Sequence, residues 1–459
     1  MTLRERIIRA GTWTVVSYAT EIITRFASSL IMTRLLVPEA FGMVAASMAI
    51  IVGLQLMSDF GVRTVIIQSP RGDDAQFLRS GWTFQAVRGG VLWMVLIAIC
   101  TLLLVPAVRR LLPPESVYAS NQFPYVAIAL GFSIVLSGLE STTLSLNVRK
   151  LNFRPIFISD LISRSTPLPV MVISSLYYPN VWAIVAGTLV GGFARMALSH
   201  AIIPGPTMWF SYRRDHIIEI ISFGKWINLA SFSTFIGSQS DYIILGILLP
   251  GPMIGIYYLA KTLYDAIEGL LERLNSAMTL PVMGEVVRNN PGFIADRYYR
   301  FRLPLELLAT TSGGFLFAAA DAIIHFLYDE RYQGAGAMLR ALSIGLVLYP
   351  FPLIRSAFTA TGEAYVTAWV SVIQAISFIM GLVLGYYIAG PLGAVAGGML
   401  SRTVPALVIL CMAYRRNWMI PLYEIRCLPA SVAGLFLGYL VTYLLAPYTV
   451  TDVRHFFLP

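Results

Sequence analysis

Apolar stretches of about 20 residues recur along the chain, and short breaks rich in proline, glycine and charge separate them. Stretches such as 91–105 (VLWMVLIAICTLLLV) lack the strict alternation of a β-barrel strand, so they predict membrane-spanning helices. The predicted fold class is an all-α polytopic membrane protein. With the breaks as boundaries, the chain has thirteen predicted spans: 11–36, 40–67, 81–106, 121–146, 156–178, 181–203, 217–249, 253–281, 301–328, 335–360, 363–389, 391–414 and 428–446.

The first predicted hairpin, Gly11 to Val44, has a diverged copy at Gly224 to Tyr257. The two segments align without a gap, and both place a tryptophan near the start and a proline-containing break before the second helix. A repeat of this length in an apolar chain is typical of transporters built from two homologous halves. We therefore predict pseudo-symmetric six-helix lobes at 1–210 and 211–415, followed by an extra C-terminal span and tail at 416–459.

Composition and charge agree with a membrane protein. Hydrophobic residues make up 57% of the chain and charged residues 12%, against about a quarter charged in soluble domains. The net charge of +9 comes from Arg and Lys residues in many short loops, without a basic arm or a nucleic-acid motif, so no nucleic-acid partner is expected. These residues concentrate on one side of the predicted topology, and by the positive-inside rule the N-terminus is predicted to be cytoplasmic. The opposite side holds Arg109, Arg110, Arg331 and Arg454.

Nothing in the sequence predicts a catalytic site. Cys100, Cys411 and Cys427 are odd in number and form neither a disulfide framework nor a metal-binding motif. The predicted outer loops are short, and no GxxxxGK[ST] segment occurs, which argues against ATP hydrolysis. We expect a protein that is not an enzyme and that holds no cofactor or metal.

Ionisable residues inside the predicted spans are informative because a charge in a bilayer is costly unless it faces a cavity or a partner. In the eighth span, Lys261, Asp265 and Glu268 follow steps of four and three residues, which places them on one face of a helix. Glu272 and Tyr257 extend this stripe. The sequence therefore predicts that the eighth span lines a water-filled cavity between the two halves.

The first and seventh spans, which are partners in the repeat, carry similar stripes. The first span offers Tyr18, Glu21 and Arg25, and the seventh offers Ser238 with Asp241 on its flank. These helices are predicted to line the same cavity.

A structural interpretation of the charges is also open. Lys261 and Asp265 are spaced as an i,i+4 pair that neutralises itself on one helix, and so are Glu21 and Arg25. On that interpretation neither pair needs a cavity or a ligand.

Three other features of the predicted spans have local explanations. Asp160 and Arg164 have the spacing of a structural i,i+4 pair, and Asp59 lies near Arg63 at a predicted interfacial helix end. Arg355 follows a proline-rich break that would kink the tenth span, which makes this arginine a candidate for the cavity.

The segment MTRLLVPEAFGMVAASMAIIVGLQLMSDFGVRTVIIQ (residues 32–68) carries a family resemblance. Its R-L-L-x-P-E-x-F-G turn, its S-D-x-G and its I-I-Q ending are similar to the opening of the bacterial polysaccharide transporters, the Wzx-type flippases. The Y-Y-L-A-K-T-L run from Tyr257 also resembles that family. The family belongs to the multidrug/oligosaccharidyl-lipid/polysaccharide (MOP) superfamily.

The resemblance implies two six-helix lobes in a V, with spans one, two, seven and eight around a central cavity. It implies a polyprenyl-pyrophosphate-linked oligosaccharide as cargo, flipped across the bacterial inner membrane by alternating access during exopolysaccharide, capsule or O-antigen (lipopolysaccharide) biosynthesis. The implied partners are this lipid-linked oligosaccharide, membrane lipids, and polysaccharide polymerase and export machinery. A thirteenth span without a fourteenth departs from the family pattern.

For a flippase, a cationic cavity would hold the pyrophosphate, and carboxylates would bind a coupling cation. The candidate substrate-binding residues are Arg25, Lys261, Tyr18, Ser238, Tyr257 and Arg355, and the candidate ion-coupling residues are Glu21, Asp265, Glu268 and Asp241.

Two other functions remain open. A MATE-like drug/cation antiporter of the same superfamily would favour an acidic, aromatic cavity, and Arg25 and Lys261 argue against it. A membrane polymerase or ligase of lipid-linked sugars would need a large outer loop with catalytic Arg or His, and the predicted outer loops are short.

Overall fold

The computed structural model describes residues 3–289, 294–424 and 426–445. Apart from one isolated bridge, the regular structure in these ranges is helical, as the sequence predicts. Contacts divide the chain into two compact units, Met1–Gly255 and Ile256–Pro459, called unit 1 and unit 2 below.

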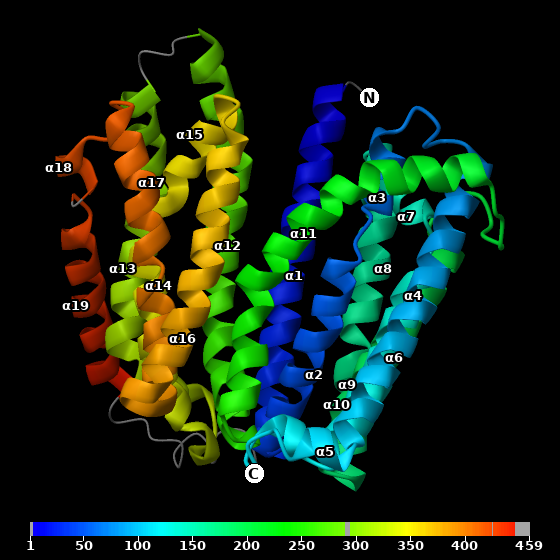
Figure 1. The fold of residues 1–459 in the computed structure, drawn as a ribbon, viewed down its shortest axis with the longest axis horizontal. Coiled ribbons are helices and arrows are strands. Elements are labelled where there is room, and N and C mark those ends of the chain that lie inside the picture. The colour runs from blue at the N-terminus through cyan, green and yellow to red at the C-terminus, as the bar shows by residue number, and fades with distance from the viewer. Residues whose placement is uncertain (1–2, 290–293, 425, 446–459) are drawn as a thin grey trace. The chain divides into compact units, whose positions relative to one another are not determined.

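Unit 1 is built from long helices, several of which are broken into two consecutive pieces (Figure 1). Its helices are α1 (Leu3–Leu35), α2 (Pro38–Met57), α3 (Val62–Gln68), α4 (Ala75–Leu104), α5 (Pro106–Arg109), η1 (Val117–Ala119), α6 (Phe123–Gly138), α7 (Thr143–Arg149), α8 (Arg154–Ser165), α9 (Pro167–Tyr177), α10 (Val181–Ala201) and α11 (Arg214–Leu248).

Helix α11 belongs to unit 1 because it packs along α2. A Cβ atom on Gly53 of α2 would lie 2.6 Å from the ring of Phe235 in α11, so glycine lets the two helices approach. The boundary between the compact units is therefore at residue 255, whereas the sequence repeat divides the chain after residue 210. Packing and repeat are different criteria, and the boundary at 210 stays a prediction.

The turns of the two repeat copies touch each other inside unit 1. A Cβ atom on Gly42 would lie 2.1 Å from the carbonyl oxygen of Gly251, and a Cβ atom on Gly255 would lie 1.8 Å from that of Pro38. In the gapless alignment Gly42 corresponds to Gly255 and Pro38 to Gly251, so the contact is reciprocal. A two-fold relation between the copies would produce such a contact. Both copies need glycine here because backbone atoms fill the space of a side chain.

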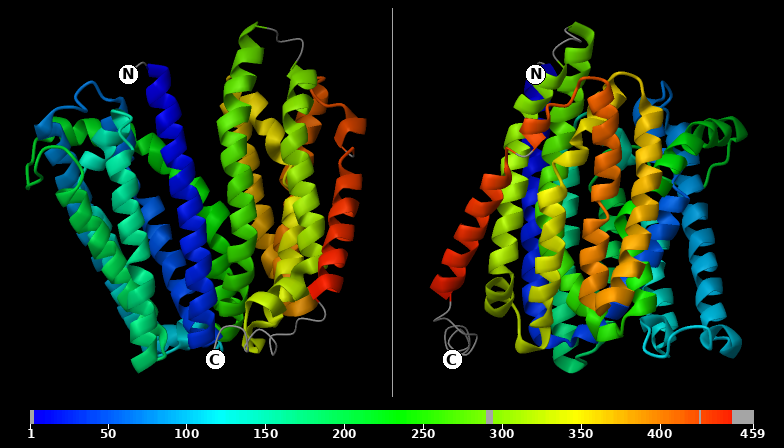
Figure 2. Two further views of the ribbon diagram at one scale, coloured as in Figure 1. Left: turned by 180° about the vertical axis from the view of Figure 1, so that it is seen from behind. Right: turned by 60° about the vertical axis from the view of Figure 1, so that its left-hand side comes forward.

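Unit 2 begins in the first turns of a long helix, and its last described helix packs on α13 (Figure 2). Its helices are α12 (Gly251–Asn289, from residue 256 onward), α13 (Ile294–Leu327), η3 (Glu330–Tyr332), α14 (Gly334–Leu348), η4 (Phe351–Ile354), α15 (Arg355–Ala360), α16 (Ala364–Leu400), α17 (Thr403–Arg415), α18 (Pro421–Glu424) and α19 (Leu428–Leu445).

Each predicted span corresponds to one helix or to two consecutive helices. The second, fourth, fifth and tenth spans are broken, as α2/α3, α6/α7, α8/α9 and α14/α15, and the twelfth is divided between the end of α16 and α17. Helices α6 and α7 bend by 56°. Proline explains two of the breaks, because it lacks an N–H and clashes with the preceding turn: Pro167 begins α9, and Pro350 and Pro352 lie between α14 and α15. The α-helix is therefore interrupted where the sequence predicts a kink in the tenth span.

Helix α16 contains the eleventh span and the start of the twelfth. The chain reverses at Gly390, where φ is +62°, a left-handed conformation that glycine adopts without steric cost. After the reversal the two arms pack closely, because a Cβ atom on Gly385 would lie 2.0 Å from the carbonyl oxygen of Gly393. Small residues therefore hold this hairpin together, as is common in membrane helices.

Helix α19, the thirteenth predicted span, packs along α13. A Cβ atom on Gly314 of α13 would lie 2.1 Å from the carbonyl oxygen of Ser431, and one on Gly434 of α19 would lie 2.1 Å from that of Thr311. The last apolar segment is therefore an integral part of unit 2. The residues after 445, including the predicted outer end of the chain, lie outside the described ranges.

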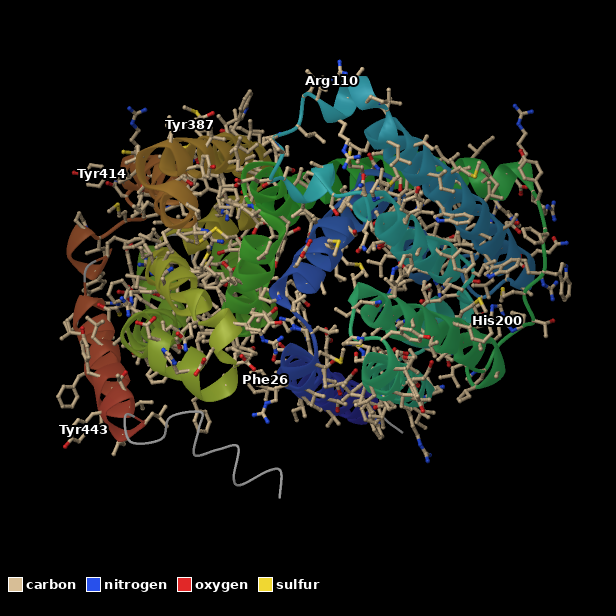
Figure 3. All side chains as sticks on the ribbon, turned by 90° about the horizontal axis from the view of Figure 1, so that it is seen from below. Phe26, Arg110, His200, Tyr387, Tyr414 and Tyr443 are labelled. Carbon is tan, nitrogen blue, oxygen red and sulfur yellow. The ribbon has the colours of Figure 1, made fainter. Side chains whose placement is uncertain are left out.

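The helices suit a membrane in length and surface. Among the described residues, seven helical segments are long and apolar enough to cross a bilayer, and the bent α6–α7 pair makes an eighth. Figure 3 shows Tyr387, Tyr414 and Tyr443 on the periphery of unit 2, each more than half exposed. Exposed tyrosines near helix ends are typical of the membrane–water interface. The protein is a multi-pass membrane protein.

Candidate functional site

In unit 1, ionisable side chains on α1, α8 and α10 and between α6 and α7 form two groups of ion pairs. Glu21 of α1 pairs with Arg164 of α8 at 3.0 Å. Arg195 of α10 contacts Glu140, between α6 and α7, at 3.0 Å and Asp160 of α8 at 2.9 Å. The predicted local pair of Asp160 with Arg164 is therefore wrong, because each finds its partner on a neighbouring helix.

Together the two groups hold three carboxylates and two guanidinium groups, so they carry an excess of one negative charge if all five side chains are ionised. Their side chains are 15–34% exposed, so water reaches part of them. Glu21, a candidate ion-coupling residue, already has a cationic partner. A coupling cation bound by Glu21 would have to compete with the guanidinium of Arg164.

The other unit 1 candidates lie along α1 and α11. Arg25 is exposed, one turn beyond Glu21, and the side chain of Tyr18 lies outside the described residues. On α11, Ser238 is half-buried and Asp241 is 3% exposed. The Asp241 carboxylate accepts a hydrogen bond from the backbone N–H of Tyr242 at 2.9 Å. Asp241 is thus a buried acid about two turns before the end of α11.

In unit 2, the first two charged residues of the α12 stripe lie on the same face of the helix, as the sequence predicts. Lys261 contacts Asp265 at 3.2 Å, and the lysine side chain is only 10% exposed. The i,i+4 pair that the structural interpretation predicts is therefore present. Tyr257, one turn earlier, is 1% exposed, so it is part of the packed interior.

On the next turn of α12, Glu268 pairs with Arg402, which the sequence does not identify as its partner. Glu268 accepts a hydrogen bond from Arg402 at 2.5 Å and another from the Tyr264 hydroxyl at 2.8 Å. Arg402 lies between α16 and α17 and also donates to the Tyr264 hydroxyl at 3.0 Å. Glu268 thus neutralises an arginine from the twelfth span, while Glu272, one turn on, is exposed.

Arg355, the last candidate, begins α15 directly after the proline-rich break. Its guanidinium donates to the side-chain oxygen of Gln374 in α16 at 3.1 Å. The residue is half-buried. This partner is neutral, and among the residues that the structure describes Arg355 has no ion pair, so its positive charge is not compensated there.

The sequence did not identify Arg164 as the partner of Glu21, nor Arg402 as the partner of Glu268. The sequence does show that each arginine lies within an apolar stretch, where it needs an acidic partner. The sequence does not say which helix supplies that partner, because the partners lie far apart along the chain.

The amino-acid sequence matches a known family over most of its length. A family model described as "Polysaccharide biosynthesis protein" matches residues 31–337. The chain is 22% identical over 405 residues to the succinoglycan biosynthesis transport protein ExoT of Rhizobium meliloti (strain 1021), covering 87% of this chain and 76% of that protein. It is 19% identical over 453 residues to the lipopolysaccharide biosynthesis protein WzxC of Escherichia coli (strain K12), covering 95% and 89%.

Solved structures share the fold. The inward closed conformation of the lipid II flippase MurJ matches with a TM-score of 0.68 and 15% identity, covering 97% of this chain and 99% of that one. An inward-facing MATE multidrug resistance transporter of the MOP superfamily matches with a TM-score of 0.63 and 14% identity, covering 93% and 96%. At these identities the likeness establishes the fold alone.

Proposed function

The chain belongs to the polysaccharide biosynthesis protein family, and from that premise we propose that it flips a polyprenyl-pyrophosphate-linked oligosaccharide across the bacterial inner membrane. It is a membrane transporter of this family, not an enzyme, so a polymerase or ligase is excluded. We propose that the N-terminus is cytoplasmic and that cargo moves from the cytoplasmic to the outer leaflet by alternating access of two six-helix lobes.

The observation that carries this proposal is the match to two curated proteins over 87% and 95% of the chain. Both are named for the biosynthesis of a polysaccharide, and one of them is named a transport protein. The fold supports transport in general, since it is shared with a lipid flippase and with a drug transporter. The family match favours the saccharide cargo.

We propose that Arg25 and Lys261 contact the pyrophosphate of the cargo, with Tyr18, Ser238 and Arg355 as further contacts. Tyr257 is buried in this structure and would join them only in a conformation that exposes its side chain. A pyrophosphate that enters a partly dehydrated cavity needs cationic donors, and each charge-assisted contact contributes about 1.5–3 kcal/mol. Lys261 is already next to Asp265, so cargo binding would shift its ammonium group from one anion toward another.

We propose that carboxylates on the same helices bind the coupling cation. The candidates are Glu21, Asp265, Glu268 and Asp241. Glu21 and Glu268 face arginines, so a cation could bind there only as the arginine moves away. Such competition would couple ion binding to helix movement.

The test is deletion of the gene in its own organism, followed by complementation. Loss of surface polysaccharide, with lipid-linked oligosaccharide accumulating on the cytoplasmic face, is the expected result. Restoration by the wild-type gene is the control. Normal polysaccharide together with increased sensitivity to cationic drugs would instead support the antiporter function.

A further inference from the structure

A polar cavity of about 350 Å³ lies inside unit 1, where α2, α3, α4 and α6 meet. It is close to two helix breaks, between α2 and α3 and between α6 and α7. It is separate from the candidate residues on α1, α11 and α12, since none of them lines it. Its polar side chains are Gln55, Asp59, Arg63, Thr64, Gln85, Arg88 and Ser137.

Asp59, the acidic residue of this cavity, stabilises the break between α2 and α3. Gly61 has a φ of +59°, and its N–H donates to Asp59 Oδ1 at 2.8 Å. The hydroxyl of Ser231 in α11 donates to the other carboxylate oxygen of Asp59 at 3.3 Å. Asp59 therefore stabilises the backbone at the break, and its oxygens are engaged there. The predicted neighbour, Arg63, is not its ion-pair partner.

Arg88 of α4 enters the cavity with most of its hydrogen-bonding capacity unused. The guanidinium donates one hydrogen bond, at 3.4 Å, to the backbone oxygen of Gln55. Its distance to Asp59 Oδ1 is 3.8 Å, which is too long for a hydrogen bond. The side chain is 22% exposed, and an arginine has five N–H donors. A guanidinium at this depth is costly unless something accepts those donors.

Other donors around Arg88 are also available. Among the residues that the structure describes, no side-chain hydrogen bond or ion pair involves Arg63, Thr64 or Gln85. Two arginines face one carboxylate, so the lining has a net charge of +1. The lining therefore suits an anion that accepts several hydrogen bonds at once.

We propose that this cavity binds a phosphate group carried by an amphiphile in the membrane. The non-ester oxygens of a phosphate match the planar fork of Arg88 and leave acceptors for Arg63, Thr64 and Gln85. A volume of about 350 Å³ is in the range of small-ligand sites. The group belongs either to an anionic phospholipid or to an isoprenyl diphosphate. The phospholipid occupant is independent of the proposed function, whereas the isoprenyl diphosphate occupant rests on it. Binding to the purified protein tests this site, and surface polysaccharide tests the proposed function.

The experiment uses the full chain in detergent micelles and native mass spectrometry to count retained lipids. The probes are phosphatidylglycerol, a long-chain isoprenyl diphosphate and, as the zwitterionic control, phosphatidylcholine. For at least one of the first two probes, Arg88→Gln should weaken binding about tenfold, because a charge-assisted fork is lost. Arg88→Lys should retain part of the affinity, since the charge remains without the fork.

Two further variants keep the test decisive. Arg63 is exposed, so Arg63→Gln should fold normally and still weaken the same probe about threefold. Arg110, which is labelled in Figure 3, is exposed and does not line the cavity. It supplies the matched control Arg110→Gln, which should bind as the wild type does.

The pattern of losses identifies the source of the phosphate. A loss confined to phosphatidylglycerol assigns the cavity to a lipid headgroup, and a loss confined to the isoprenyl diphosphate assigns it to the diphosphate. If Arg88→Gln and Arg63→Gln both retain every probe as the wild type does, the cavity holds water and the proposal is wrong.

Discussion

Two arginines in membrane-length helices, Arg302 of α13 and Arg88 of α4, have opposite surroundings. Arg302 is 2% exposed and donates to Glu424 at 2.6 Å and to Glu306 at 3.1 Å. Arg88 donates one long hydrogen bond to a backbone oxygen, and its nearest carboxylate, on Asp59, is 3.8 Å away. The same residue type thus forms a closed network in one region and an open one in the other.

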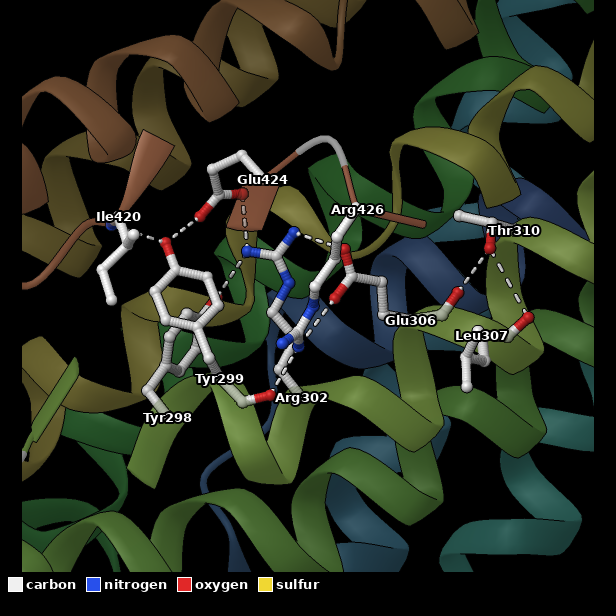
Figure 4. Close-up of polar contacts among 9 residues, drawn as sticks. All are labelled: Tyr298, Tyr299, Arg302, Glu306, Leu307, Thr310, Ile420, Glu424 and Arg426. Carbon is white, nitrogen blue, oxygen red and sulfur yellow. Dashed lines mark hydrogen bonds and ion pairs between the residues drawn. The ribbon is translucent and has the colours of Figure 1, made fainter. Parts of the chain in front are cut away.

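Figure 4 shows how the network of Arg302 closes. Arg426 donates to Glu306 at 3.3 Å, and the Tyr299 hydroxyl donates to Glu424 at 2.5 Å. Two guanidinium groups therefore meet two carboxylates, and among the described residues the buried Nε atoms of both arginines have no hydrogen-bond partner. These contacts tie α13 to the segment around α18 that leads into α19. A buried arginine alone is thus a poor sign of function, and an arginine with unused donors is a better one.

The largest expected effect comes from opening the closed network. Glu306→Gln removes one of two carboxylates and leaves a buried guanidinium uncompensated, which should lower the free energy of unfolding by about 3–5 kcal/mol. Thermal unfolding of the purified protein in nanodiscs measures it. Glu363→Gln is the control, because its partner Arg416 is half exposed, and it should cost about 1 kcal/mol or less. Equal losses in both variants would contradict the structural role of the network.

The pair of Glu268 and Arg402 tests whether a satisfied pair can also be functional. Glu268→Gln or Arg402→Gln alone should destabilise the protein by about 2–3 kcal/mol, because one charge loses its partner in a mostly buried position. The double variant should recover much of that stability. If Glu268 also binds the coupling cation, the double variant should remain inactive in polysaccharide export. Recovery of both stability and export would limit Glu268 to a structural role.

Lys261 provides a smaller and more specific test. Lys261→Gln should weaken cargo binding by about one to two orders of magnitude, whereas Lys261→Arg should retain much of the export activity. The double variant of Lys261→Gln with Asp265→Asn leaves no uncompensated charge from this pair. Surface polysaccharide at matched protein levels is the measurement. If the double variant restores export, Lys261 serves its neighbour Asp265 and not the cargo.

The sequence predicted the helices better than the contacts between them. The length of each apolar stretch and the positions of residues such as Pro350 and Gly390 determine where helices begin, break and turn, and these are local properties. The Lys261–Asp265 pair was predictable for the same reason, since residues four apart on a helix are neighbours.

The partners of Arg164 and Arg402 were not predictable, because they depend on which helix faces which. Asp160 has the right spacing for Arg164, yet it contacts Arg195 of α10. The cavity around Arg88 was missed for a related reason: its lining comes from four helices, and the sequence does not show that the donors remain unused.

The smallest expected effect concerns Glu21 and Arg164. They form an ion pair, unlike the long contact of Arg88, but this pair is more exposed than the network of Arg302. Both side chains are about one-third exposed, so water screens the pair, and Arg164→Gln should lower the free energy of unfolding by no more than about 1 kcal/mol. If Glu21 binds the coupling cation, the same change should still alter transport, because a competing guanidinium is gone and the cation should bind more tightly.

The measurement is export as a function of sodium concentration and of pH, with Arg110→Gln as the control. A shift toward lower cation concentration is expected for Arg164→Gln and absent for the control. If the two variants respond alike, Glu21 and Arg164 form a structural pair, and the coupling site must be sought among the carboxylates of α11 and α12.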